Sequence, residues 1–271
     1  MIPPLPFDLG PAAMAWVALV CAAAGFVRGY SGFGFAALIV TGAGLVSDPM
    51  RFVAVVILAD LVLTAQQARG LRGQVDWRRV AGLFAGCLVG VPLSVWGLAA
   101  VGVDAARAAI SVWVLAMCLL LAAGWRLRAR GDGVNLGVGL VSGLANGAAV
   151  GGLPVAAAFA AQGVAPAAFR ATLIAYFCAL DLWTLPVMAQ AGLVSRDTVL
   201  ATLWLLPAMS LGVWAGGRRF IATPPEDFRR FAILLMAGLA VAGLLRSVTW
   251  GALPPAPPPP LAPPARAQEG P

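Results

Sequence analysis

The sequence predicts an all-α polytopic membrane protein, with about eight membrane spans arranged as two inverted repeats. The first observation is composition: 61% of the 271 residues are hydrophobic, 11% are charged, and the mean hydropathy is +0.90. A soluble domain averages about half apolar and about a quarter charged residues, so a soluble chain of this composition could not cover its surface. The other two observations are a series of long apolar segments and an order of features that occurs twice. At about 20 residues per span, the length allows about eight spans with their connections.

The apolar segments follow one another along the whole chain, at 11–28, 33–47, 50–68, 79–99, 105–124, 134–150, 152–163, 167–190, 197–216 and 228–248. Six of them are long enough to cross a membrane as ordinary helices. The segments 33–47 and 152–163 are too short to cross comfortably, and each follows a glycine-rich break. We expect each to form a broken pair with the helix before it. From residue 253 on, the chain is Pro-rich and predicts an exposed, disordered tail.

The two halves of the chain carry the same features in the same order. Each half has glycines that precede a short apolar segment, namely Gly25, Gly29, Gly32 and Gly34 in the first, and Gly143, Gly147, Gly151 and Gly152 in the second. Each then has an arginine followed by an aspartate inside an apolar helix, Arg51 with Asp60 and Arg170 with Asp181. Such internal duplication is typical of transporters. It predicts a first transmembrane repeat over 1–124, a cytoplasmic linker over 125–133, a second repeat over 134–250 and a disordered tail over 251–271.

The arginine distribution predicts the orientation of the chain. The Arg-rich connections are 69–79, 126–130 and 218–230, and an even number of crossings separates each from the next. They lie on one face, which the positive-inside rule makes cytoplasmic. Both termini then face away from the cytoplasm. Because each half has an odd number of elements, the two halves are predicted to be inverted relative to each other.

The glycine-rich breaks are the best candidates for a binding site. Glycine lets the backbone approach a ligand closely, and the helix that follows presents open N–H groups and the positive end of its dipole. Arg28 adds a cation beside the first break, and Asn146 adds an amide beside the second. The predicted anion-binding residues are Arg28, Gly29, Ser31, Gly32, Gly34, Asn146, Gly147, Gly151 and Gly152. The alternative is that the glycines serve close helix packing while Arg28 extends to the membrane interface.

Asp60 and Asp181 lie deep inside apolar segments, where an ionised carboxylate is costly. With no histidine in the chain, they are the predicted proton-coupling residues. Asp181 is the better candidate, because Asp60 shares its half with Arg28 and an ion pair would hold it charged. The alternative is a structural hydrogen bond or that ion pair. Gln66, Gln67 and Gln190 are candidates for lining a path, whereas Arg170 is expected to anchor the cytoplasmic side.

The residue types exclude several chemistries. All 18 basic residues are arginine and histidine is absent, which excludes a Ser-His-Asp triad and the histidine pair of zinc proteases. The four cysteines are isolated, so we expect no metal site and no cofactor. No basic run with interleaved aromatic residues indicates nucleic-acid binding. The expected partners are the lipid bilayer and a small anionic substrate.

The paired motifs GFVRGYSGFGF, at 25–35, and GLVSGLANGAAVGGLP, at 139–154, resemble those of the TauE/SafE sulfite exporter family. The resemblance spans most of residues 12–248. It implies about eight spans in two repeats, and transport of sulfur-containing or carboxylate anions across the bacterial inner membrane. Tyr30, Phe33 and Phe35 interrupt the first glycine run, where many relatives have a denser cluster.

The function predicted from these observations is a secondary transporter, an exporter of a small anion such as sulfite or an organosulfonate, in the cell inner membrane. No P-loop motif is present, so ATP hydrolysis by that route is excluded. A non-transporting membrane partner or scaffold is one alternative. An intramembrane aspartyl enzyme using Asp60 and Asp181 is another, although Asp60 lacks the GxGD context of intramembrane aspartyl proteases. We therefore expect no enzyme activity.

Overall fold

A computed structural model describes residues 6–67, 74–124, 129, 131–220, 233–234 and 236–245. Within these ranges the regular structure is entirely helical. A short 3₁₀ helix, Pro6–Asp8, precedes α1 (Pro11–Ser31), α2 (Phe35–Ala43), α3 (Pro49–Gln67), α4 (Trp77–Ala99), α5 (Val103–Ala122), α6 (Asp132–Asn146), α7 (Gly152–Ala161), α8 (Pro166–Gln190) and α9 (Arg196–Phe220). A further short apolar helix covers Met236–Leu245. The Pro-rich tail, residues 126–128 and 130, and parts of the loops 69–79 and 218–230 lie outside the described residues.

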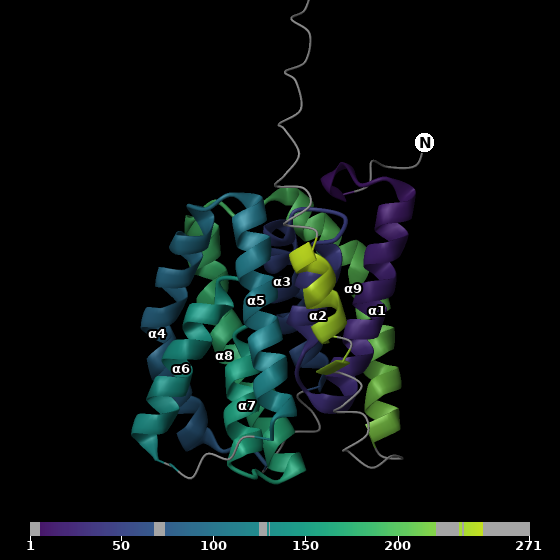
Figure 1. The fold of residues 1–271 in the computed structure, drawn as a ribbon. Helices are drawn as coiled ribbons and strands as arrows, with labels where there is room; N and C mark the ends of the chain where they lie inside the picture. The colour runs from purple at the N-terminus through teal and green to yellow at the C-terminus, as the bar shows by residue number, and fades with distance from the viewer. Residues whose placement is uncertain are drawn as a thin grey trace, which may run out of the picture.

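Six helices of the described chain, α1, α3, α4, α5, α8 and α9, are long and apolar enough to cross a membrane. The predicted class, an all-helical multi-pass membrane protein, is therefore confirmed. The helices α3 and α8 form its centre, because 61% of the residues in their apolar windows are buried, against 33–44% for the other spans. They pack against each other, and in Figure 1 they lie between α4 and α6 on the left and α1 and α9 on the right.

The chain breaks where the sequence predicts it to break. The first helix ends at Ser31, Gly32 and Gly34 adopt left-handed backbone conformations with φ of 81° and 84°, and α2 begins at Phe35. A side chain is strained at such positive φ angles, so glycine is favoured at both positions. The second break separates α6 from α7, and there the left-handed residue is Ala149, with φ of 56°. The predicted short helices over 33–47 and 152–163 are present as α2 and α7.

Glycines bring the first helix of the chain into direct backbone contact with the ninth. A methyl group on Gly29 of α1 would lie only 2.8 Å from the carbonyl carbon of Val213 and 2.9 Å from the amide nitrogen of Gly217. On α9, Gly212 and Gly216 meet the backbone of α1 in the same way. Small residues at such intervals allow membrane helices to pack closely without a hydrophobic driving force between them.

A second pair of helices, α4 and α6, also packs closely through glycines. Gly86 and Gly90 of α4 face the backbone of α6, while Gly139 and Gly143 of α6 face the backbone of α4. The hydroxyl of Ser94, on α4, fixes this pair further, because it donates to the carbonyl of Gly143 at 2.9 Å. The C-terminal half of α6 therefore packs directly on α4, as the C-terminal half of α1 packs on α9.

The helices α1 and α6, one from each glycine-packed pair, run in opposite directions through the molecule. In Figure 1, α1 begins at the top and α6 begins at the bottom. Accordingly α2 and α7, which follow them, also run in opposite directions. Their N-termini approach each other near the middle of the bundle, beside α3 and α8.

The tight contact between α4 and α6 leads to a stability prediction. Replacing Gly90 by Ala puts a methyl group 2.7 Å from the Leu144 amide nitrogen and 2.9 Å from the Gly143 carbonyl carbon, so the helices must separate. Overpacking of this kind costs about 1–3 kcal/mol, more than the gain of up to about 1 kcal/mol in helix propensity. We expect Gly90→Ala to lower the unfolding temperature in detergent.

Gly97 on the same helix is the matched control. A methyl group there meets nothing within 4 Å, so Gly97→Ala is expected to leave the unfolding temperature unchanged or to raise it. Equal unfolding temperatures for the two variants would contradict close packing through Gly90.

Candidate functional site

A small cavity lies at the centre of the bundle, where α1, α2, α3, α7 and α8 meet. Its free volume is about 30 Å³, room for one or two water molecules. The polar side chains that line it are Arg28, Asp60, Asn146 and Asp181. These are four residues that the sequence singled out, and the fold brings them together from both halves of the chain.

Arg28 is buried inside the bundle, with 1% of its surface exposed. One guanidinium nitrogen forms an ion pair with Asp60, Nη2 donates to Thr64 Oγ1 at 2.8 Å, and Nε donates to Gln67 Oε1 at 3.3 Å. The ring of Phe35, the first residue of α2, lies 5.4 Å from the guanidinium carbon. Arg28 is thus held by one face of α3 and does not extend to a membrane interface.

Asn146 occupies the corresponding place at the second break. Its amide nitrogen donates to Thr184 Oγ1 at 2.8 Å, and its side chain lines the same cavity as Asp181. Within the described part of the chain, Oδ2 of Asp181 has no hydrogen-bond partner although it is buried. The arrangement repeats that around Arg28, with α8 in the role of α3 and a neutral amide in the role of the cation.

Asp60 and Asp181 line the same small cavity, so their carboxyl groups lie close to each other. Two ionised carboxyl groups in so small a cavity repel each other, which favours a proton on one of them. Asp60 already faces Arg28 as the partner of its charge. The cavity therefore contains one cation, one carboxyl group paired with it, and one carboxyl group with no cation of its own.

The starts of two short helices complete the cavity wall, although the Leu153 N–H of α7 already donates to the Val150 carbonyl at 3.3 Å. The first residues of α2, Phe35 to Ala37, and of α7, Gly152 and Leu153, line it. Neither Gly34 nor Gly151, the N-cap residues of these helices, provides a side-chain cap. A helix start leaves its first N–H groups without intrahelical partners and carries the positive end of the dipole. A guanidinium, an amide and two such helix starts form an environment that favours a small oxyanion.

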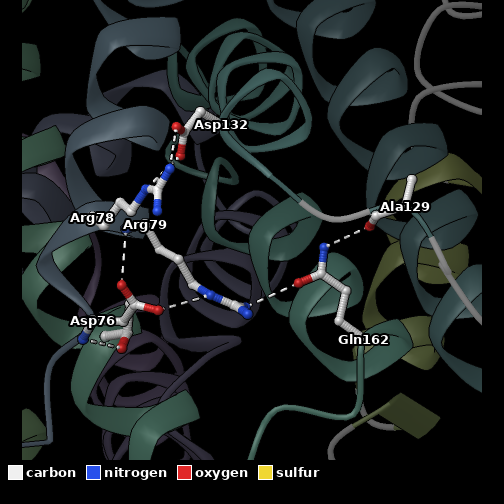
Figure 2. A network of polar contacts seen from close by, with 7 residues as sticks. Asp76, Arg78, Arg79, Ala129, Asp132 and Gln162 are labelled. Atoms are coloured by element: carbon white, nitrogen blue, oxygen red, sulfur yellow. Dashed lines mark hydrogen bonds and ion pairs between the residues drawn. The ribbon is translucent and has the colours of Figure 1, made fainter.

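The far ends of both short helices are held by arginines. At the end of α2, Arg107 donates to the carbonyl oxygens of Gly44 at 3.0 Å and Ser47 at 3.3 Å. At the end of α7, Arg79 donates to Gln162, the C-cap residue, at 2.9 Å (Figure 2). A cation at a helix C-terminus complements the negative end of the dipole. These contacts fix the short helices from behind, with their positive ends directed at the cavity.

Figure 2 shows that the contact at Gln162 belongs to a wider network at this end of the bundle. Arg79 pairs with Asp76 at 3.0 Å, Arg78 pairs with Asp132 at 2.8 Å, and Gln162 donates to the carbonyl of Ala129 at 3.3 Å. The network joins the starts of α4 and α6 to the end of α7. It holds the helices of the second break in one arrangement.

The predicted site glycines divide into two groups. Gly34 and Gly152 line the cavity. The others support the breaks: Gly29 packs on α9, Gly32 lies against Arg170, the Gly147 N–H donates to Ser94 Oγ at 3.0 Å, and the Gly151 carbonyl accepts from Ser142 at 2.6 Å. Ser31 is the last residue of α1, and its side chain is not among the described parts of the structure.

Several polar residues at the site were not predicted. Thr64 and Thr184 each lie one helical turn after an aspartate, and they accept from Arg28 and Asn146. Recurrence at this spacing was the available signal, but a threonine in an apolar helix more often bonds its own backbone. Of the candidate glutamines, Gln67 contacts Arg28, whereas Gln190 is exposed. Arg170, predicted to be a peripheral anchor, lies half-buried against Gly32 beside the site.

The fold and this enclosed polar site define a multi-pass helical membrane protein with a cavity between two broken helices. Residues 17–243 match the family model described as Sulfite exporter TauE/SafE. The chain belongs to the TauE/SafE family, as the resemblance of its glycine motifs predicted. No match was found among the curated proteins or among the solved structures. Membership makes the protein a membrane transporter of the anion-exporter type.

The contacts of Arg28 predict that Thr64 stabilises the fold. In Thr64→Val, the buried guanidinium loses an acceptor, which costs about 1–3 kcal/mol. Thr202 is the control, because it is also buried but its hydroxyl donates only to the Thr198 carbonyl of its own helix, at 2.8 Å. Thermal unfolding in detergent should show a clearly larger loss for Thr64→Val than for Thr202→Val. An equal loss would mean that Arg28 does not depend on this acceptor.

Proposed function

We propose that the protein is a secondary transporter that exports a small oxyanion, such as sulfite or an organosulfonate, across the bacterial inner membrane. The observation that carries the proposal is the central cavity, in which Arg28, Asn146 and the N-termini of α2 and α7 converge. These groups come from both halves of the chain and lie at the centre of the bundle, where a transporter needs its site to be reached alternately from either side.

We further propose that the two halves are inverted repeats about this cavity. Three correspondences support this. Helix α1 packs on α9 as α6 packs on α4, through glycines in both cases. Arg28 reaches the threonine after Asp60 as Asn146 reaches the threonine after Asp181. The equivalent helices α1 and α6 also run in opposite directions.

The charges around the cavity suggest how anion binding and protonation are linked. With both carboxyl groups ionised, the cavity would hold a net negative charge and repel an anion. A proton on Asp181 removes that charge, and the anion then competes with Asp60 for Arg28. The membrane potential adds about 2.3 kcal/mol per charge per 100 mV to the outward movement of an anion. Export therefore requires no obligatory ion gradient, and protonation acts by making the cavity accessible to the anion.

Flux of labelled sulfite in proteoliposomes tests the proposal. Arg28→Gln removes the cation of the cavity, and loss of a charge-assisted hydrogen bond costs about 1.5–3 kcal/mol, or roughly tenfold to over a hundredfold in affinity. Arg196→Gln is the control, because it removes an exposed arginine from the start of α9, far from the cavity lining. We expect wild-type flux for Arg196→Gln and a strongly raised KM for Arg28→Gln. A wild-type KM for Arg28→Gln would overturn the assignment of this cavity.

The two aspartates are expected to differ in their effect on the pH dependence of flux. Wild-type flux should fall as pH rises, because loss of the Asp181 proton restores a negative charge to the cavity. Asp181→Asn keeps the position neutral, so its flux should be nearly independent of pH. Asp60→Asn instead frees Arg28 from its partner and should lower KM while retaining the pH dependence. If Asp60→Asn alone abolished the pH dependence, the proton would have to be assigned to Asp60.

A further inference from the structure

A second, larger cavity lies between the C-terminal ends of α3 and α9 and the start of α8. Its free volume is about 340 Å³, against about 30 Å³ for the central cavity. Arg170 of α8 and Arg218 of α9 line it, together with Gln66, Gln67 and Ser210. We call this space the vestibule. It lies at the end of the bundle where α3 stops before the Arg-rich loop 69–79.

A contact between Gln67 and Arg28 links the vestibule wall to the central cavity. Gln67 belongs to the vestibule wall, and its side-chain oxygen accepts a hydrogen bond from Arg28 Nε at 3.3 Å. The other side of the same guanidinium pairs with Asp60 in the central cavity. Arg170 lies against Gly32, whose N–H donates to the Arg28 carbonyl at 2.9 Å. An anion bound at Arg170 would therefore lie next to Arg28 and the central cavity.

The charge of the vestibule is one-sided. Among the described residues, its lining contains two arginines and no carboxylate. A cavity of similar volume, about 360 Å³, lies at the opposite end of the bundle and is lined by Asp8, Asp48 and Asp197 with one arginine, Arg51. A recess lined by one sign of charge concentrates ions of the other sign. An oxyanion is therefore attracted to the vestibule and is not attracted to the opposite cavity.

The vestibule also has an apolar wall that suits a short organic group. The Arg218 guanidinium stacks on the Trp214 ring, at 3.9 Å from its centroid, and Val213 lies one residue away along α9. Gln66 donates to Ser210 Oγ at 3.3 Å on the same wall. The space thus offers cations for an oxyanion head and an indole face for the carbon beside it.

We propose that the vestibule is a second anion-binding site, which takes up a small oxyanion at this end of the protein and passes it along Arg170 and Gln67 to Arg28. The inference rests on the proposed function and deepens it, since it assigns the loading side of the transporter. By the arginine distribution this side is cytoplasmic, which is the side required for export.

The test labels a cysteine in the vestibule wall. Ser210→Cys is made in a Cys178→Ala background, because Cys21, Cys87 and Cys118 are buried. The new thiolate attacks a methanethiosulfonate reagent, a mixed disulfide forms and methanesulfinate leaves. We compare the rates for sulfonatoethyl methanethiosulfonate, an anion, and its trimethylammonioethyl analogue, a cation. Focusing by the arginines should favour the anionic reagent by about tenfold or more, and methanesulfonate should slow its reaction.

Charge variants test whether the preference for the anionic reagent depends on the vestibule arginines or on the charge of the protein as a whole. Arg170→Gln and Arg218→Gln should each reduce the preference for the anionic reagent, whereas Arg196→Gln, at the other end of α9, should leave it unchanged. A preference that survives both vestibule variants, or no protection by methanesulfonate, would overturn the inference. As a measurement without a cysteine, Arg170→Gln should raise the KM for sulfite about tenfold when sulfite is supplied at the vestibule side only. An equal rise from both sides would also overturn it.

The outcomes distinguish this inference from the proposed function. If sulfite flux is observed but labelling of Ser210→Cys is not charge-selective, the proposed transport function stands and the vestibule is not an anion-binding site. If labelling is charge-selective and slowed by methanesulfonate, but neither sulfite nor methanesulfonate is transported, the vestibule is an anion-binding site and the proposed transport function is overturned.

Discussion

A positive charge enclosed among apolar helices has to be paired, and the polar architecture of this protein follows from that requirement at Arg28. An uncompensated buried charge costs about 3–5 kcal/mol, a large part of the stability of a typical protein. The partners Asp60, Thr64 and Gln67 recur at intervals of four and three residues, so they share one face of α3. That face looks into the bundle because α3 is among its most buried helices. The same ion pair that makes Arg28 tolerable also leaves Asp181 as the one carboxyl of the cavity without a cation.

The position of Arg28 depends in turn on contacts that have no charge at all. Gly29 and Gly25 seat α1 directly on the backbone of α9, so the helix that carries Arg28 cannot shift sideways. Gly32 and Gly34 then turn the chain so that α2 starts beside the guanidinium. Arg107 and Arg79 hold the far ends of α2 and α7. Rigid packing on three sides confines movement to the cavity and to the helices that line it, as preorganised binding requires.

The sequence was informative where a residue type conflicts with its surroundings. Glycines that interrupt an apolar run predicted both breaks, and Asp60, Asp181 and Arg28 stood out because charge is costly in a membrane. Thr64 and Thr184 did not stand out, since a threonine that bonds its own helix looks the same in sequence. The vestibule could not be foreseen, because Gln66, Arg170 and Arg218 come from three helices whose proximity is a property of the fold. The pairing of α1 with α9 was missed for the same reason, since glycine spacing shows that a helix packs closely but not on which partner.

The packing of α1 on α9, and of α4 on α6, also bears on how such a protein could have arisen from a shorter one. Each half of the chain gives its first helix to the other half and receives one in return. A half made as a separate chain would expose the glycine face of its first helix, with no surface of its own to cover it. If the halves are the inverted repeats proposed above, a second copy inserted in the opposite orientation would cover that face. Gene fusion would then have joined two subunits that were already interlocked, and the loop between α5 and α6 is the place where that joint would lie.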